Sequence, residues 1–133
     1  MIRYFTHDFL VESTSTNKID GCFLYHVSLY CNNNKVGVNE DYEKFLVTVG
    51  NPDGVAHHLK VIQDIYKKSK ENNFFRGPFY ISEYYDEQII LQQLKEKIES
   101  ISAITKRELI IKLSPFFEWE YTSDDNVISE VFN

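Results

Sequence analysis

The residues best suited to chemistry are two cysteines, four histidines and several closely spaced carboxylates. His57 and His58 are neighbours on an expected helix, where successive side chains point about 100° apart and cannot face one metal ion. A helical zinc pair needs an i,i+4 spacing such as His-Glu-x-x-His, which the sequence lacks. His7 and His26 fall on expected strands without a carboxylate partner fixed by the sequence. We therefore expect surface or hydrogen-bonded histidines, with no metal and no cofactor.

The two cysteines, Cys22 and Cys31, are nine residues apart on one expected strand and its end. Nine residues of strand span about 30 Å, whereas a disulfide needs Cα atoms within about 7 Å. We expect free, partly buried thiols and a reducing compartment. Either thiol could act as a nucleophile with a distant histidine, but no local signature supports this. Because no phosphate-binding glycine loop can be built either, we expect that the protein is not an enzyme.

Paired carboxylates occur at two places. Asp86 and Glu87 begin an expected helix, where negative charge is favoured by the helix dipole. Glu118 and Glu120 flank Trp119, so in a strand both acids point to the same face. Two interpretations of this pair stay open: a half-exposed strand with its aromatic side buried, or an acidic stripe offered to a partner at some cost in repulsion.

The net charge of -6 is distributed unevenly. Residues 1–43 carry six acids and three bases, residues 44–76 carry three acids and six bases, and residues 77–133 carry eleven acids and five bases. The bases of the middle segment are Lys44, Lys60, Lys67, Lys68, Lys70 and Arg76, and Asp64 and Glu71 dilute them. An acidic surface disfavours nucleic acid and suits a basic protein partner. The alternative is that the charge only maintains solubility.

Hydrophobic alternation predicts the strands. The expected strands are 2–11, 20–31, 43–50, 79–82 and 117–121, with a short segment near 35–38 that could extend the meander. In the third strand, Phe45, Val47 and Val49 are expected to face the core.

Capping residues predict the helices. Asn51 followed by Pro52 begins the first helix, whose expected core stripe is Val55, Leu59, Ile62 and Tyr66. Asp86 begins the second helix, which buries Ile90, Leu94, Ile98 and Ile101. Thr105 and Glu108 form a capping box for the third. The tail from Asp124 onward is expected to be a short helix or loose.

These elements give the order β-β-β-α-β-α-α-β. Local strands followed by collected helices favour an α+β fold, with a mainly antiparallel sheet of about five strands and three helices. The length of 133 residues predicts one domain over 1–133. No signal peptide opens the sequence and no apolar run approaches the roughly 20 residues of a membrane helix, so a cytoplasmic location is expected.

The stretch 109–121 contains Leu-Ser, an aromatic residue and then Trp-Glu-Tyr before acidic residues. This stretch resembles the ending of the immunity protein 8 family. Two further segments resemble that family in the same order. Residues 45–52 resemble its strand that runs into a proline helix start, and residues 79–86 its strand that leads to an aromatic-Asp helix start. The resemblance covers roughly residues 40–125.

The resemblance implies an immunity protein that binds the C-terminal domain of a cognate bacterial toxin, from a polymorphic or contact-dependent system, and masks its active site. A basic nuclease is the expected toxin, bound without direct contact to nucleic acid or membrane. The candidate toxin contacts are Glu83, Tyr84, Tyr85, Asp86, Glu118, Glu120, Tyr121, Asp124 and Asp125. The alternative is a small ligand- or protein-binding α+β domain of unrelated role, and the oligomeric state stays open.

Overall fold

The computed structural model describes residues 1–36, 41–68, 77–121 and 124–132. Its elements are β1 (Phe5–Ser13), a 3-10 helix η1 (Ser15–Lys18), β2 (Leu24–Asn32), β3 (Glu43–Gly50), α1 (Pro52–Lys68), β4 (Phe79–Ile81), α2 (Glu87–Glu99), α3 (Lys106–Leu113), β5 (Glu118–Trp119) and α4 (Asp125–Phe132). The predicted α+β class and element order are confirmed.

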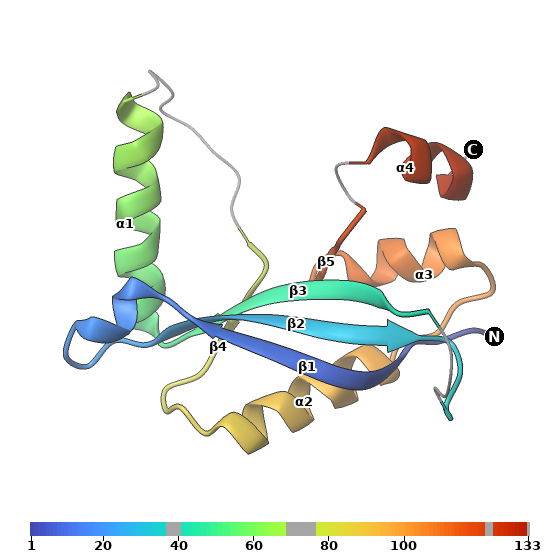
Figure 1. The fold of residues 1–133 in the computed structure, drawn as a ribbon, viewed down its shortest axis with the longest axis horizontal. Coiled ribbons are helices and arrows are strands. Elements are labelled where there is room, and N and C mark those ends of the chain that lie inside the picture. Colours follow the sequence, from blue (N-terminus) through green and yellow to red (C-terminus); the bar gives the residue numbers. More distant parts are fainter. Residues whose placement is uncertain (37–40, 69–76, 122–123, 133) are drawn as a thin grey trace.

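The sheet is an antiparallel meander of β1, β2 and β3 with two short strands on its far edge (Figure 1). β4 joins β3 in parallel along Thr48–Gly50, and β5 joins it antiparallel at Phe45 and Leu46. The outer edge of β3 is therefore shared by two segments that are far apart in the sequence.

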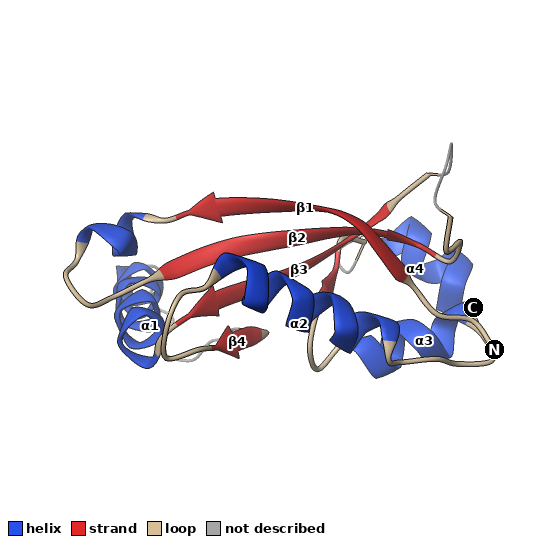
Figure 2. Cartoon of the chain, turned by 90° about the horizontal axis from the view of Figure 1, so that it is seen from below, coloured by secondary structure: helices blue, strands red, loops and turns tan. Residues whose placement is uncertain are grey.

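One face of the sheet carries the core. Side chains alternate across a strand, so Val27, Leu29, Phe45, Val47 and Val49 share the lower face, and all five are buried. Figure 2 shows α2 lying across this face, with α3 beyond it. The core stripes of these two helices are buried against the sheet: Ile90, Leu94, Ile98, Leu109, Ile110 and Leu113. We call the opposite side the upper face.

The base of α1 is fixed by Asn51, as the sequence predicted. Its Oδ1 accepts hydrogen bonds from Gly54 N at 2.8 Å and Phe23 N at 3.3 Å, and its Nδ2 donates to Gly21 O at 2.7 Å. Gly54 and Val55 are the buried residues of α1. Beyond this base, the helix rises from one end of the sheet, away from α2 (Figure 1).

The predicted core stripe of α1 is therefore wrong beyond Val55. Leu59, Ile62 and Tyr66 are half-buried because the helix contacts the sheet at its base and projects past it. The spacing of apolar residues shows which side of a helix is apolar, but it does not show how much of that side packs against the rest of the protein.

The two capping predictions for α2 and α3 are confirmed. Asp86 Oδ1 accepts from Ile89 N at 3.2 Å, and Thr105 Oγ1 accepts from Glu108 N at 3.2 Å. In a capping box the Glu108 carboxylate would accept a second hydrogen bond from the N–H of Thr105. Here Glu108 Oε2 instead accepts from the N–H of the preceding residue, Ile104. That backbone bond, followed by Lys112, lowers the pKa of the Glu108 carboxyl.

Several boundaries differ from the prediction. The first strand begins at Phe5, because Ile2 instead pairs with Ala103 in an isolated bridge. The last strand is confined to Glu118–Trp119, and the tail forms a fourth helix, α4, which was one of the two predicted alternatives for it. Residues 35 and 36 form a bend, while the rest of the expected segment near 35–38 lies outside the described residues, as do Lys70 and Arg76. Within the described parts, no helix combines the length and apolarity needed to cross a membrane.

Candidate functional site

The first group of predicted contact residues forms the loop between β4 and α2. Glu83, Tyr84, Tyr85 and Asp86 are all exposed, and 76% of the surface of Tyr84 is accessible. The start of the loop is held by two hydrogen bonds of Ser82. Ser82 N donates to Gly50 O at 3.0 Å, and Ser82 Oγ donates to Tyr84 O at 2.8 Å. An aromatic side chain in a fixed backbone loses little conformational entropy on binding.

Tyr85 anchors this loop to the sheet. Its ring stacks on Tyr25 of β2, with centroids 4.3 Å apart and planes 18° apart, and it lies 5.4 Å from the Phe23 ring. Partial burial, followed by the nearby Glu87 carboxylate, raises the pKa of Tyr85 to about 12. The phenol is therefore neutral at physiological pH and can donate a hydrogen bond. The predicted strand 20–31 contains Phe23 and Tyr25, but sequence alternation does not reveal which distant ring they meet.

The second group lies along β5 and the start of α4. Glu118 is exposed, and its neighbour Trp119 is buried. Because β5 ends at Trp119, Glu120 lies in a turn, where its N–H donates to Lys44 O at 3.0 Å. Glu120 is half-buried, so the structure disfavours the acidic stripe, which was one of the two interpretations of this pair. Its hydrogen bond to Tyr121 raises the pKa of that phenol.

The aspartates of this group begin α4. Asp124 Oδ1 accepts from Asn126 N at 3.1 Å, and Asp124 O accepts from Ile128 N at 2.9 Å. Asp125 is the first residue of the helix. The Asp124 carboxylate thus serves as a helix cap, as does that of Asp86, so a role in the helix start explains both acids as well as contact with a toxin would.

The structure does not bring the two groups into one site. β4 ends where Ile81 pairs with Gly50, whereas Glu118 pairs with Leu46. These points are four residue steps apart along β3, which corresponds to about 13 Å. The β4–α2 loop is therefore the better-defined candidate, and we call residues 83–87, the loop with the first residue of α2, the acidic–aromatic loop.

The upper face contains a small pocket that was not predicted. His26, Thr48, His58, Phe79 and Glu118 help to line its volume of about 180 Å³. His26 Nδ1 lies 3.1 Å from Thr48 Oγ1, and the His58 ring is 6.1 Å from that of His26. Across the described ranges, no three or more His, Cys, Asp or Glu side chains are grouped so that they could hold a metal ion.

An apolar groove of about 390 Å³ lies between α3, β5 and α4. Ile110, Phe117, Trp119 and Ile128 supply apolar walls, and Glu118 stands among them. This size is at the lower end for pockets that bind small molecules. The groove is the feature that best fits the alternative of a ligand-binding domain.

Comparisons with known protein families, curated proteins and solved structures give no match to this chain. The resemblance to the immunity protein 8 family therefore rests on the short segments around Pro52, Asp86 and Trp119 alone.

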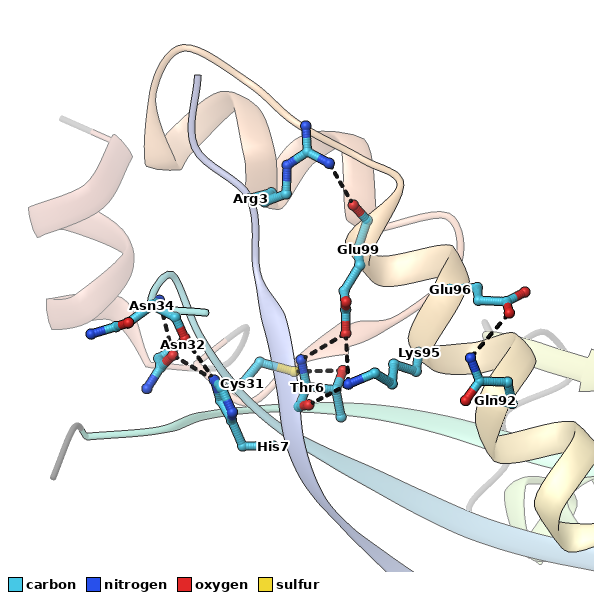
Figure 3. A network of polar contacts seen from close by, with 10 residues as sticks. All are labelled: Arg3, Thr6, His7, Cys31, Asn32, Asn34, Gln92, Lys95, Glu96 and Glu99. Carbon is cyan, nitrogen blue, oxygen red and sulfur yellow. Dashed lines mark hydrogen bonds and ion pairs between the residues drawn. The ribbon is translucent and has the colours of Figure 1, made fainter. Parts of the chain in front are cut away.

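A polar network surrounds the Cys31 thiol where β1, β2 and α2 meet (Figure 3). Cys31 Sγ lies 3.5 Å from Thr6 Oγ1. The Thr6 backbone is held by α2, since its N–H donates to Glu99 Oε2 at 3.2 Å and its carbonyl accepts from Lys95 Nζ at 3.1 Å. Lys95 and Glu99 also form an ion pair at 3.2 Å. The network ties α2 to the edge strand.

The chemistry of this thiol is governed by burial. Desolvation raises the pKa of Cys31 to about 12, against a smaller opposing effect of the Thr6 hydroxyl. The reactive form of a cysteine is the thiolate, and at pH 8 it would be only on the order of 10⁻⁴ of the population at this pKa. Cys31 is thus a buried structural residue, whereas Cys22 is half-buried.

We expect one fast-reacting thiol per folded chain. At pH 8, a disulfide reagent such as Ellman's reagent should label Cys22, while Cys31 should react only at the rate of unfolding. Cys22→Ser should remove the fast phase and Cys31→Ser should retain it. Rapid labelling of Cys31 in the folded protein would overturn this assignment and restore the thiol as a candidate nucleophile.

Proposed function

We propose that this protein is a cytoplasmic immunity protein that binds a cognate toxin domain and masks its active site. The observation that carries the proposal is the acidic–aromatic loop. Tyr84 is highly exposed, Tyr85 is stacked on the sheet, and Glu83 and Glu87 are exposed beside them. Tyrosine is enriched among the residues that dominate protein interfaces.

The charge of the loop defines the partner. Glu83, Asp86 and Glu87 place three carboxylates within five residues, in a chain segment that is itself strongly acidic. Such a surface accelerates encounter with a basic protein and disfavours acidic ones. A nuclease presents basic side chains where it holds phosphate, so carboxylates are suited to cover that surface. The proposal assigns no catalytic step to this protein.

The apolar groove beside Glu118 supports the alternative of small-ligand binding. A ligand held there would not contact Tyr84, which follows β4 at the other end of the β3 edge. A substitution at Tyr84 therefore separates the two functions.

The test uses the polypeptide encoded by the neighbouring open reading frame, with association rate and dissociation constant measured by surface plasmon resonance at low and high salt. Tyr84→Ala should raise the dissociation constant about 30-fold, the cost of about 2 kcal/mol typical of an interface hot spot. Glu83→Lys should slow association and weaken its salt dependence. Tyr42→Ala is the matched control, because Tyr42 is also exposed (42%) but lies before β3.

Two results would contradict the proposal. One is that neither the neighbouring gene product nor any toxin domain from the source bacterium binds the protein. The other is a complex whose affinity is the same for Tyr84→Ala, Glu83→Lys and Tyr42→Ala, because the loop then lies outside the interface.

A further inference from the structure

Strand β1 forms one edge of the sheet, and its outer side is partly closed. It comes first in the sheet order, and Figure 2 shows no helix or strand of the described residues beyond its free side. At Thr6 the outward N–H and C=O are already bonded to Glu99 and Lys95 of α2. At Phe9 the N–H donates to Asp8 Oδ1 at 2.8 Å. Side chains of the protein itself therefore occupy one half of this edge.

The other half of the edge is open. The Phe9 N–H is bonded to a side chain of its own strand, so it faces outward rather than toward β2. In an antiparallel strand the outward backbone groups recur at every second residue, and the register with β2 runs without a shift from Asp8 to Ser13. Val11 and Ser13 therefore also direct their N–H and C=O groups away from β2. Unpaired backbone groups in a row are a template for an added strand.

The side chains beside the open half define which kind of strand fits there. On the lower face, Phe9 and Val11 are half-buried and pack at the margin of the core. On the upper face, Asp8 and Glu12 are exposed, and β1 contains no lysine or arginine. An added strand places alternate residues on the same two faces. Its apolar residues would extend the core, and its basic residues would lie opposite the two acids.

We propose that the open half of β1, residues 9–13, binds an extended basic segment of another protein as an additional antiparallel strand. Val11 then exchanges two hydrogen bonds with the residue opposite it. The residues opposite Glu12 and Asp8 lie one position before and three positions after that residue in the added strand. The recognised pattern is therefore basic–apolar–any–apolar–basic, with main-chain bonds giving affinity and the alternate side chains giving specificity. Because β1 has no basic residue, it lacks this pattern, and a second copy of the strand is not the expected occupant.

This site is distinct from the acidic–aromatic loop. The loop follows β4, which lies at the opposite end of the strand order from β1. Substitutions in the loop should therefore leave strand addition at β1 unchanged, and the proposal stands independently of toxin binding.

Titration of a synthetic peptide into the nitrogen-15-labelled full chain tests the proposal. The peptide Ser-Lys-Val-Thr-Val-Lys-Ser carries the pattern, and at concentrations up to about 5 mM it should shift the amide resonances of Val11 and Ser13 and slow their hydrogen exchange. N-methylation of its first valine removes the N–H that bonds to the Val11 carbonyl and should raise the dissociation constant about tenfold or more. N-methylation of its threonine, whose N–H faces away from β1, is the matched control and should change the constant little.

Protein variants locate the site. Val11→Pro removes the outward N–H, a change that an edge strand tolerates on its free side, and should raise the dissociation constant of the peptide about tenfold or more. Val11→Ile keeps the N–H and an apolar side chain, so it is the matched control and should bind as the parent does. The double variant Asp8→Asn, Glu12→Gln keeps the shape of both side chains and should weaken binding about fivefold or more at low salt and much less at high salt. Circular dichroism checks the fold of each variant.

Three results would refute strand addition at β1. The first is that the peptide causes no change at residues 9–13 at any concentration. The second is that it binds but the shifted resonances lie elsewhere in the chain. The third is that the two N-methylated peptides bind with equal affinity, which would show that the main chain of the peptide does not pair with the edge.

Discussion

Gly54→Ala should destabilise the protein by about 3 kcal/mol, although alanine normally stabilises a helix interior by roughly 1 kcal/mol relative to glycine. A Cβ atom on Gly54 would lie 2.0 Å from the carbonyl oxygen of Phe23 and 2.9 Å from Asn51 Oδ1. The first neighbour is backbone, so it cannot turn aside as a flexible side chain could. The base of α1 would have to move off the sheet, at the cost of the Asn51 cap.

The measurement is chemical denaturation followed by circular dichroism. Ala56→Gly, an exposed position two residues later on the same helix, is the matched control and should cost about 1 kcal/mol in the ordinary direction. Glycine to alanine at position 54 and alanine to glycine at position 56 are thus both expected to lower the free energy of unfolding. A Gly54→Ala protein as stable as the parent would mean that α1 does not press against the start of β2.

Glu43→Ala should cost about 3 kcal/mol. The Glu43 carboxylate accepts a hydrogen bond from the buried Tyr4 hydroxyl through Oε2 and from Lys106 Nζ through Oε1. Burial, followed by the bond to Glu43, raises the pKa of Tyr4 far above its usual range, so the phenol stays protonated and needs an acceptor. Alanine removes the acceptor for both donors, and the Tyr4 hydroxyl would remain buried next to Phe45.

A double-mutant cycle with Tyr4→Phe isolates this contact. Tyr4→Phe alone should cost about 1 kcal/mol, since Glu43 keeps Lys106, and the double variant should cost less than the sum of the single ones. Glu96→Ala serves as the control, because the Glu96 carboxylate also accepts a side-chain hydrogen bond, from Gln92 Nε2 at 3.0 Å, but at an exposed site where substitutions usually change stability little. Additive effects at Tyr4 and Glu43 would show that the hydroxyl finds another acceptor.

The parts of the fold that could be predicted from the sequence are those set by local chemistry. Asn51, Asp86 and Thr105 begin the three helices that were expected, because a capping side chain bonds to N–H groups two or three residues away. Strand β3 was predicted with its observed ends, since the Asn51-Pro52 pair stops it. These features depend on neighbours in the chain and not on the remainder of the fold.

The features that escaped prediction depend on contacts between distant segments. The ring of Tyr85 meets Tyr25 across 60 residues, and only the pairing of β4 with β3 brings them together. Alternation predicted Glu118 and Glu120 on one face, but β5 ends between them as the chain turns back toward β3. Helix α1 is amphipathic as predicted. Which of its residues contact the sheet depends on the close approach of Gly54 to the Phe23 carbonyl, which the sequence pattern does not show.

The division of the β3 edge between β4 and β5 has a consequence for synthesis on the ribosome. Strands β1 to β3 are complete by residue 50, but the segments that close the sheet, β4 and β5, are made about 30 and 70 residues later. Until then the edge of β3 offers unpaired backbone groups, and the faces of Val27, Leu29 and Phe45 that α2 and α3 will cover stay in water. The nascent chain therefore passes through a three-stranded stage with an unpaired edge and an uncovered apolar face. At this stage it is most prone to aggregate with other chains.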